Sequence, residues 1–319
     1  MNDSKITSIT LLRAIAALLV CFVHIQMISG FHSNFVVDYI MSNGQQGVGI
    51  FFVISGFILP YSLYKKNYVL KEFFSFLLRR SIRIDPPYWC IIALSFIFGV
   101  VPIALLTFNS VLLHVFYLVP FVKDANWYSG VFWTLSIEFQ FYLLLGIFFP
   151  FLMRLKANIA ILILVIVNII CVLSKITSRG IIIDQMPCFV MGFIAFMVYI
   201  KRVNLTSGVL VLLTLSAYVM VAVSIKSGAV PLITALFILF YRYQNEVQPL
   251  YFIGNISYSL YLIHLPASLL FAEYFGSYLP SKSSLFLACL LVSILSAYVY
   301  YLLIERYALK LSKAVKLSR

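Results

Sequence analysis

Long runs of apolar residues recur along the whole chain, and short polar or charged segments separate them. Runs of about 20 apolar residues have the helix length that crosses a bilayer about 30 Å thick. We predict about ten membrane-spanning helices, at 7–28, 45–64, 86–106, 131–153, 158–175, 181–200, 206–224, 228–244, 250–274 and 283–306. The segments 158–175 and 228–244 are the shortest for this purpose. The predicted fold class is all-α, a polytopic integral membrane protein.

Composition agrees with this pattern. Of the 319 residues, 63% are hydrophobic and only 10% are charged, whereas a soluble domain has about 25% charged residues. No block has a soluble composition, so we expect one membrane domain over 1–319 and no appended soluble domain. The five cysteines have no metal-ligand spacing, and we expect neither a disulfide framework nor a metal site.

The basic residues predict the orientation of the helices. With a cytoplasmic N-terminus, 18 of the 23 lysines and arginines fall on the inner side and five on the outer side. The outer five are Lys123, Lys175, Arg179, Lys226 and Lys282. We therefore expect both termini to be cytoplasmic. Topology and contact with anionic lipids account for the net charge of +13 without a nucleic-acid partner.

Arg13 and His24 interrupt the first apolar helix and lie eleven residues apart. Eleven residues at 100° each bring the two side chains within about 20° of one direction, about 16 Å apart along the axis. Ionisable residues inside a membrane usually face a protein interior or a watery cavity. For this helix alone, a structural explanation is as good as a functional one: the arginine would snorkel to the surface, and the histidine would bond to a neighbouring helix.

Glu138 interrupts another apolar helix, about 10 Å from its predicted outer end. Thr134, Glu138 and Tyr142 follow one another at intervals of four residues, which places them on one helix face. Intramembrane ionisable residues of this kind are functional candidates by default.

His264 lies in the ninth predicted helix, about 21 Å from its inner end, on the same face as Ser257 and Tyr261. His24, Glu138 and His264 therefore reach a similar predicted depth from three separate helices. Each residue alone is explained by a structural hydrogen bond. Together they predict a shared polar site in the outer half of the membrane.

Arg80 and Arg83 precede the third predicted span, in the stretch "RRSIRIDPPYW", and share a helix face. Pro86 and Pro87 predict a helix break at this point. With Arg13, these residues form a cationic cluster at the predicted cytosolic mouth. Positive-inside charge is one explanation, and a phosphate-binding cradle is the other, because paired guanidinium groups suit phosphate oxygens.

The stretch "NGQQGVGIFFVISGF" contains Gly44, Gly47, Gly49 and Gly56 together with Ser55. Small residues in a membrane helix permit close helix contact, which is the interpretation we favour. The alternative is that the glycines leave room for a thin substrate chain.

These motifs together resemble the acyltransferase 3 family of membrane O-acyltransferases. The resemblance covers nearly the whole chain and rests on five stretches in order: the Arg13–x10–His24 pair, "GVGIFFVISGF", "RRSIRIDPPYW", "FWTLSIEFQFYLL" and "ISYSLYLIHLP". It implies a domain of about ten helices that moves acyl groups, usually acetyl, from cytosolic acyl-CoA. Acceptors in the family are typically sugars of surface polysaccharides or their lipid-linked precursors. An O-acetyltransferase of the bacterial plasma (inner) membrane is thus implied, with acetyl-CoA as donor substrate and no permanently bound cofactor.

The resemblance implies roles for the residues that carry it. Arg13, Arg80 and Arg83 would bind the phosphates of acyl-CoA. His24 would act as the general base for the acceptor hydroxyl or as a transient acyl carrier, and both roles stay open.

Glu138 would either orient the His24 imidazole or bind the acceptor sugar. Tyr142, Ser257, Tyr261 and His264 are the expected substrate-binding residues. The family often has a proline soon after the glutamate of its last helix. Here Arg306 and Tyr307 follow Glu305, so we expect no catalytic role for Glu305.

Two other classes of protein compete with the enzyme interpretation. A secondary transporter or proton-coupled channel also uses buried histidine and glutamate, but it predicts inverted repeats with paired broken helices, and the sequence shows no convincing repeat. A membrane scaffold without chemistry leaves the shared depth of His24, Glu138 and His264 unexplained.

Overall fold

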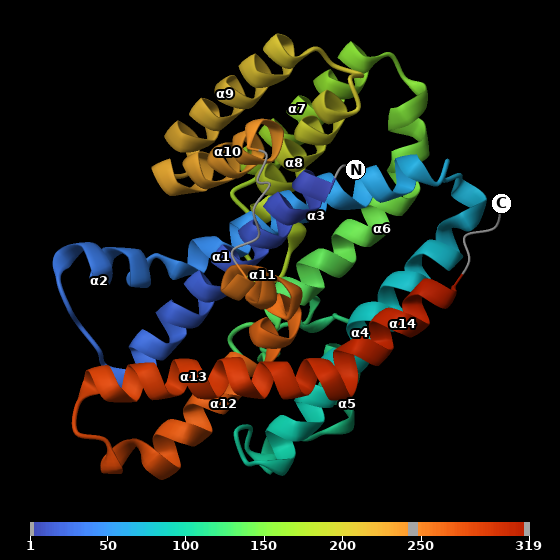
Figure 1. The fold of residues 1–319 in the computed structure, drawn as a ribbon. Helices are drawn as coiled ribbons and strands as arrows, with labels where there is room; N and C mark the ends of the chain where they lie inside the picture. Colours follow the sequence, from blue (N-terminus) through green and yellow to red (C-terminus); the bar gives the residue numbers. More distant parts are fainter. Residues whose placement is uncertain (1–2, 242–247, 316–319) are drawn as a thin grey trace.

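The computed structural model describes residues 3–241 and 248–315, and in these residues it is 82% helical without strands (Figure 1). The α-helices are α1 (Asp3–Ser29), α2 (Phe35–Ser42), α3 (Gly47–Lys65), α4 (Phe73–Ile97), α5 (Phe108–Val115), α6 (Trp133–Arg154), α7 (Ala157–Leu173), α8 (Met186–Tyr199), α9 (Leu205–Ala222), α10 (Ile225–Phe240), α11 (Gln248–Asn255), α12 (Ser257–Phe275), α13 (Lys282–Tyr300) and α14 (Arg306–Ala314). Short 3-10 helices lie at Gly44–Gln46, Leu70–Glu72, Ile103–Leu105, Val119–Phe121, Ile182–Gln185 and Gly276–Tyr278, and a π-helical segment (Tyr301–Glu305) joins α13 to α14. The all-α prediction is confirmed.

Six helical segments of the described residues are long and apolar enough to cross a membrane, by length and composition. They are Thr7–Ser29, Gly44–Lys65, Trp133–Arg154, Ile182–Tyr199, Leu205–Ala222 and Lys282–Ala314. The helices α7 and α10 are apolar but shorter, at 17 and 16 residues, and match the two spans predicted to be short. The full set of ten spans is therefore not confirmed. The end of the predicted span 228–244 and the basic residues Arg242, Lys316 and Arg319 lie outside the described residues.

The helix break predicted at Pro86 and Pro87 is wrong. The helix α4 begins at Phe73, well before the predicted start at 86, runs through both prolines and ends at Ile97. Prolines are tolerated inside membrane helices where neighbouring groups satisfy the freed backbone. Hydroxyl groups of two neighbouring helices bond to carbonyls in this part of α4: Tyr258 of α12 donates to the Ile84 carbonyl at 2.8 Å, and Tyr300 of α13 donates to the Pro87 carbonyl.

The predicted helix over 250–274 is also corrected, because the structure divides this segment between α11 and α12. The helix α11 lies so close to α1 that a Cβ atom on Gly254 would approach the Thr10 carbonyl oxygen to 2.2 Å. The Ser257 hydroxyl donates to the Gly254 carbonyl at 2.8 Å and caps the end of α11. The chain can then start α12 in a new direction.

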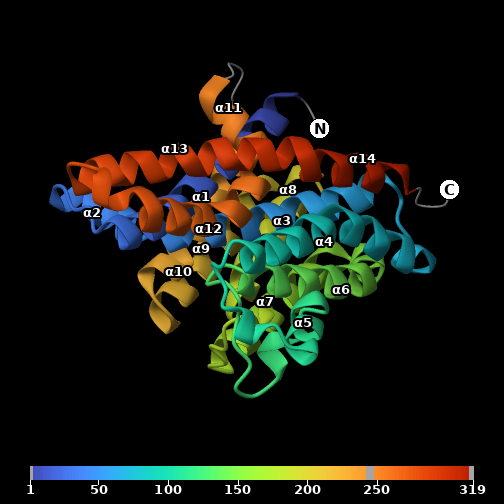
Figure 2. The same cartoon turned by 90° about the horizontal axis from the view of Figure 1, so that it is seen from below.

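The helices form two groups around a central set. In Figure 1, α7, α8, α9 and α10 lie together, and α12 and α13 lie side by side at the opposite end of the view. The helix α8 packs against α3, and α12 packs against α1, so α1 and α3 lie between the groups. Figure 2 shows that α13 and α14 run as one long line along a single face, and α14 packs against α4.

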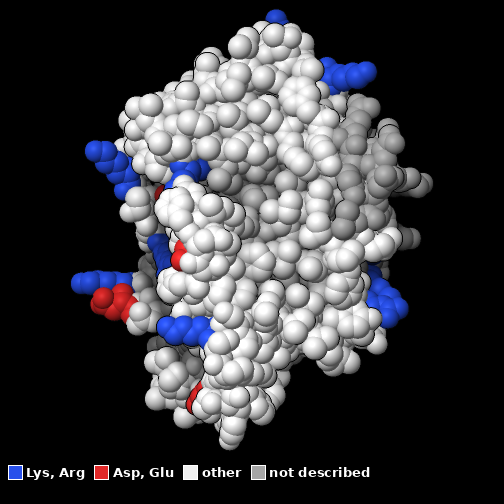
Figure 3. Space-filling view, turned by 60° about the vertical axis from the view of Figure 1, so that its left-hand side comes forward, with Lys and Arg blue, Asp and Glu red and all other residues white. Residues whose placement is uncertain are grey.

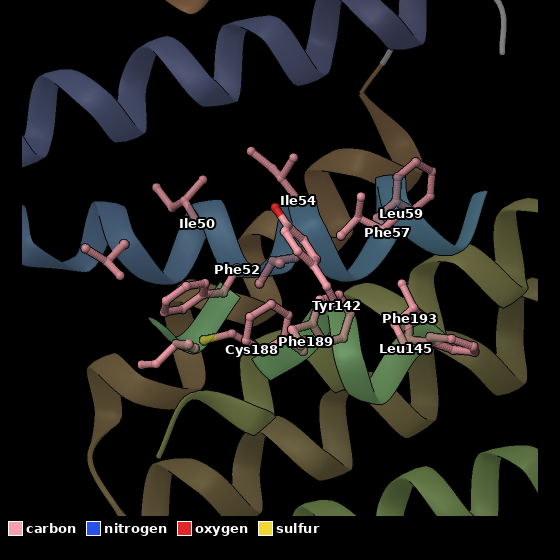
Figure 4. Packing of buried hydrophobic residues seen from close by; sticks show 14 of the residues in the cluster. Ile50, Phe52, Ile54, Phe57, Leu59, Tyr142, Leu145, Cys188, Phe189 and Phe193 are labelled. Carbon is pink, nitrogen blue, oxygen red and sulfur yellow. The ribbon is translucent and has the colours of Figure 1, made fainter. Parts of the chain in front are cut away.

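Two glycines of α3 allow close contacts with neighbouring helices. A Cβ atom on Gly47 would lie 2.4 Å from the Ala16 carbonyl oxygen of α1, and one on Gly56 would lie 2.4 Å from the Phe189 carbonyl oxygen of α8. These contacts are the ones that small residues permit between membrane helices. Figure 4 shows the resulting core, in which side chains of α3, α6 and α8 interdigitate around Phe52 and Phe189.

On one face of the molecule, charged side chains lie away from the broad middle. In Figure 3 they gather near the margins of the face, and a wide uncharged expanse lies between them. This is the pattern expected of a surface in contact with lipid. Lys66 follows directly after the end of α3. Desolvation and the nearby charges of Arg79 and Arg80 lower the pKa of Lys66 from its ordinary value.

Candidate functional site

A cavity of about 280 Å³ lies between α1, α3, α4, α6 and α12. Seven of the nine predicted site residues line it: Arg13, Arg80, Arg83, Glu138, Tyr142, Ser257 and Tyr261. Lining residues on α3 run from Val48 to Leu59, which corresponds to about 16 Å along the helix axis. We call this space the arginine cavity. Its length and narrow volume suit a thin, extended ligand.

The three arginines approach the cavity from two helices. Arg13 lies on α1, and Arg80 and Arg83 lie near the start of α4. In the described part of the chain, none of these guanidinium groups has a hydrogen bond or an ion pair within 4.0 Å. The Nε atom of Arg80 is buried without a partner, while its guanidinium carbon lies 5.7 Å from the Phe76 ring centroid. Because buried polar groups are normally paired, this arrangement leaves donors for an anionic ligand.

Glu138 provides the cavity with a carboxylate. Its Oε1 atom accepts a hydrogen bond from the Tyr142 hydroxyl at 2.5 Å and a longer one from the Ser55 hydroxyl at 3.4 Å. Figure 4 shows the Tyr142 ring extending from α6 beside α3, with its hydroxyl oxygen next to Ile54. The carboxylate also interacts electrostatically with Arg13 and Arg80. Glu138 therefore interacts both with the arginines of the cavity and with its hydroxyl groups.

Tyr261 forms the wall of the cavity on the α12 side. Its hydroxyl lies 2.7 Å from the Thr134 hydroxyl and donates to the Val131 carbonyl at 3.0 Å. Its ring meets Phe51 edge-on, with centroids 6.0 Å apart. A side chain fixed at both the ring and the hydroxyl gives this wall a defined shape.

His24 and His264 are in direct contact, and we call them the histidine pair. His24 Nδ1 lies 3.0 Å from His264 Nε2. His264 Nδ1 lies 3.0 Å from the Leu260 carbonyl oxygen, which can only accept, so His264 must donate from Nδ1. Neutral His264 then accepts at Nε2, and His24 donates from Nδ1. In this tautomer pattern His24 Nε2 carries the free lone pair of a base or nucleophile.

The histidine pair lies next to the arginine cavity without lining it. The His264 ring is 6.1 Å from the Tyr261 ring, centroid to centroid, and Tyr261 is the cavity wall. The structure thus brings His24 together with His264, and Glu138 together with Tyr142 and Ser55. It does not join Glu138 to His24 by a hydrogen bond within the described residues.

Glu305 is a neighbour of the site that the sequence interpretation set aside. It lies on the π-helical segment after α13, is almost fully buried, and accepts from the Ser259 backbone at 3.1 Å and from the Ser259 hydroxyl at 2.5 Å. It interacts electrostatically with Arg13 and Arg83. Its burial in an apolar helix was the available signal, because an intramembrane carboxylate marks a functional region by default.

No group of three or more His, Cys, Asp or Glu residues that could hold a metal ion occurs within residues 3–241 and 248–315. The charged groups of the cavity are instead three guanidinium groups, with the carboxylates of Glu138 and Glu305 nearby. Such a set favours an anionic organic ligand and acid–base chemistry at the adjoining histidines.

Comparison with known proteins agrees with this chemistry. A family model described as an acyltransferase domain, that of the acyltransferase 3 family, matches residues 6–302. No curated protein and no solved structure matches the chain. The matched range includes the arginine cavity and both histidines. The chain therefore belongs to the acyltransferase 3 family and is a membrane acyltransferase.

Proposed function

We propose that the protein is an O-acyltransferase that moves an acetyl group from cytosolic acetyl-CoA to a hydroxyl of a surface polysaccharide or of its lipid-linked or oligosaccharide precursor. The observation that carries this proposal is a cavity beside a histidine pair, lined by three arginines that have no hydrogen-bond or ion-pair partner among residues 3–241 and 248–315. Family membership supports the acyltransfer. The donor, the acceptor and the residue roles are our proposals.

Arg13, Arg80 and Arg83 bind the phosphates of the donor substrate in this proposal. Guanidinium groups form charge-assisted hydrogen bonds to phosphate, and these three have no competing partner among the described residues. Glu305 attracts Arg13 and Arg83 electrostatically, which favours their place at the cavity. The thioester arm then extends along α3 toward the level of Tyr261.

His24 Nε2 takes the proton of the acceptor hydroxyl as its oxygen attacks the thioester carbonyl carbon. The carbon–sulfur bond breaks, and the coenzyme A thiolate leaves with the proton that His24 received. His264 acts as a positioning residue, because its Nε2 holds His24 Nδ1–H and fixes the productive tautomer. Glu138 lies among hydroxyl groups, which supports a role in binding the acceptor.

Transfer through an acyl-histidine is the second route open to the same geometry. His24 Nε2 then attacks the thioester itself, the thiolate leaves, and the acceptor hydroxyl later removes the acyl group from the imidazole. Mass spectrometry of the purified protein after mixing with acetyl-CoA, without acceptor, distinguishes the routes. An acetyl adduct on His24 indicates the acyl carrier, and unmodified His24 under turnover conditions indicates the general base.

The proposed orientation puts the arginine end of the cavity and both termini in the cytoplasm of a bacterial cell. The positive-inside bias supports it. So does the position of Lys66 near Arg79 and Arg80. Acetyl-CoA then reaches the arginines from the cytosol, and the acceptor approaches from the other side.

Mass spectrometry of surface glycans tests the proposed function. A host that lacks this gene is complemented with wild type or with His24→Ala at matched expression. The proposal predicts one added acetyl mass per modified fragment with wild type and none with the variant. Wild-type glycans that remain unmodified, together with purified protein that does not bind acetyl-CoA, would overturn it.

A further inference from the structure

A second cavity, of about 440 Å³, opens between the ends of α3, α6, α7, α8, α9 and α10. It lies at the start of α3, whereas the arginine cavity extends along α3 from Val48 to Leu59. Gly49 contributes to its wall and leaves a Cβ-sized space 3.6 Å from the Cys188 sulfur. In the proposed orientation this cavity faces the extracytoplasmic side.

The lining of the second cavity differs in charge from that of the arginine cavity. Gln45, Gln46 and Gln185 provide amides, and one lysine, Lys175, is matched by one aspartate, Asp184. The Asp184 carboxylate accepts a hydrogen bond from the Gln185 amide at 2.7 Å, which fixes both groups. Donors and acceptors are therefore mixed, and the net charge of the lining is zero.

Trp133 adds a large aromatic surface to this polar lining. A sugar ring needs this combination, because each hydroxyl both donates and accepts while its C–H faces are apolar. An anionic ligand would instead favour the arginine cavity. The chemistry of the second cavity thus matches a neutral polyhydroxylated ligand.

The second cavity is connected to the reacting groups through two contacts. Val48 lines both cavities, so they meet at this side chain. The Arg179 guanidinium lies 5.6 Å from the Trp133 ring centroid and interacts electrostatically with His24 and with Tyr261. A ligand stacked on Trp133 therefore lies beside an arginine that is near the catalytic imidazole.

We infer that the second cavity binds the acceptor as a neutral sugar unit, with Trp133 beneath the ring and Gln45, Gln46, Asp184 and Gln185 around its hydroxyls. This assignment rests on the proposed function and moves the acceptor away from Ser257 and His264, where the sequence predicted it. Arg179 orients the bound sugar toward His24. The donor and the acceptor thus enter from opposite ends and meet near Val48 and Tyr261.

Cysteine labelling tests this assignment. In a background with the five native cysteines replaced by alanine, Thr177→Cys and Ser178→Cys are treated with an impermeant methanethiosulfonate. Thr177 lines the second cavity and Ser178, the next residue, does not. We expect the label on Thr177→Cys to reduce acetylation of the glycan by about tenfold or more, and that on Ser178→Cys by about twofold at most. Acetyl-CoA binding should be unchanged in both. De-acetylated glycan from the host should slow labelling at Thr177→Cys alone.

Each other outcome is decisive. Full glycan acetylation after complete labelling of Thr177→Cys overturns the acceptor assignment and leaves the proposed function standing. Loss of acetyl-CoA binding, or equal losses in both variants, also overturns it. Failure of the unlabelled wild type to acetylate any glycan points to failure of the proposed function instead.

If the cysteine-free background is inactive, a second measurement uses the chain with its native cysteines. Lys175→Ala and Lys282→Ala are then compared in the wild-type chain, since both lysines are predicted outer residues and only Lys175 lines the second cavity. The assignment predicts a higher KM for the glycan in Lys175→Ala alone, with an unchanged acetyl-CoA affinity. Equal glycan KM values in the two variants contradict it.

Discussion

The arginine cavity and the histidine pair differ in how their polar side chains are hydrogen-bonded. The three guanidinium groups of the cavity have no hydrogen bond or ion pair within the described residues, and one Arg80 nitrogen is buried without a partner. The histidine pair is connected from His24 through His264 to a backbone carbonyl. An unpaired buried group such as Arg80 Nε is costly, so its persistence indicates a ligand, whereas a connected chain of hydrogen bonds indicates a fixed geometry.

This difference separates binding from chemistry in the proposed mechanism. Removing an arginine should affect donor affinity, and removing a histidine should affect the rate of transfer. Glu138 lies between the two regions, because it interacts with the arginines and bonds to Tyr142. Variants at these positions therefore test whether donor binding and acyl transfer depend on different residues.

The largest effect is expected for His24→Ala. General acid–base catalysis contributes about 10²- to 10⁴-fold, so the transfer rate of purified protein should fall by that factor. Acetyl-CoA affinity should stay within about twofold of wild type, because His24 does not line the cavity. Full activity at normal expression would contradict the assignment of His24.

Replacing both Arg80 and Arg83 with glutamine should weaken acetyl-CoA binding by about 10²-fold, since each charged hydrogen bond contributes about 1.5–3 kcal/mol. The salt dependence of binding should also flatten. Titration of labelled acetyl-CoA at two salt concentrations checks this, with Lys201→Gln, at an exposed position just after α8, as the control. Unchanged binding would refute the phosphate-binding role.

For His264→Ala we expect a fall in kcat of about tenfold, because His24 loses the acceptor that fixes its tautomer. The KM for acetyl-CoA should not change. Partial rescue by His264→Gln, which restores an acceptor, separates positioning from packing. A rise in KM with normal kcat would show that His264 binds substrate directly.

Glu138→Gln should lower glycan acetylation by about tenfold while acetyl-CoA binds as well as before or more tightly. The carboxylate lies near the proposed phosphate site, so removing its charge relieves repulsion. Tyr142→Phe removes one hydrogen bond to the same oxygen and should have a smaller effect of about threefold. Weaker acetyl-CoA binding in Glu138→Gln would contradict this assignment.

The smallest effect on acetyl transfer is expected for a substitution at the surface, which instead reports the topology. A cysteine in place of Lys66, in a background with no other cysteine, should resist an impermeant thiol reagent in intact cells and react after permeabilisation. This follows from a cytoplasmic arginine end. Reaction in intact cells would reverse the proposed topology and the directions from which donor and acceptor enter.

Helical periodicity and intramembrane charge predicted much of the site from the sequence. The spacing of Glu138 and Tyr142 on one face is observed as a direct hydrogen bond. The three arginines predicted as a cluster do line one cavity. These predictions succeed because a helix fixes the relative direction of residues three or four apart, whatever the tertiary fold.

Features that depend on contacts between helices were not predictable in the same way. The contact of His24 with His264 joins residues 240 positions apart, and sequence spacing gives depth but not the neighbouring helix. The helix α4 continues through Pro86 and Pro87, and hydroxyl groups from two other helices, those of Tyr258 and Tyr300, bond to carbonyls beside these prolines. The second cavity combines the ends of six helices, so no single motif marks it.

The most direct test of the separation compares two donors on two proteins. Wild type and Arg80→Gln/Arg83→Gln, each in nanodiscs, are titrated with acetyl-CoA and with acetyl-pantetheine, which lacks the nucleotide and its phosphates. We predict that the double variant loses affinity for acetyl-CoA by about 10²-fold and retains its affinity for acetyl-pantetheine. An equal loss for both donors, or none for acetyl-CoA, would contradict the assignment of the arginine cavity to the donor phosphates.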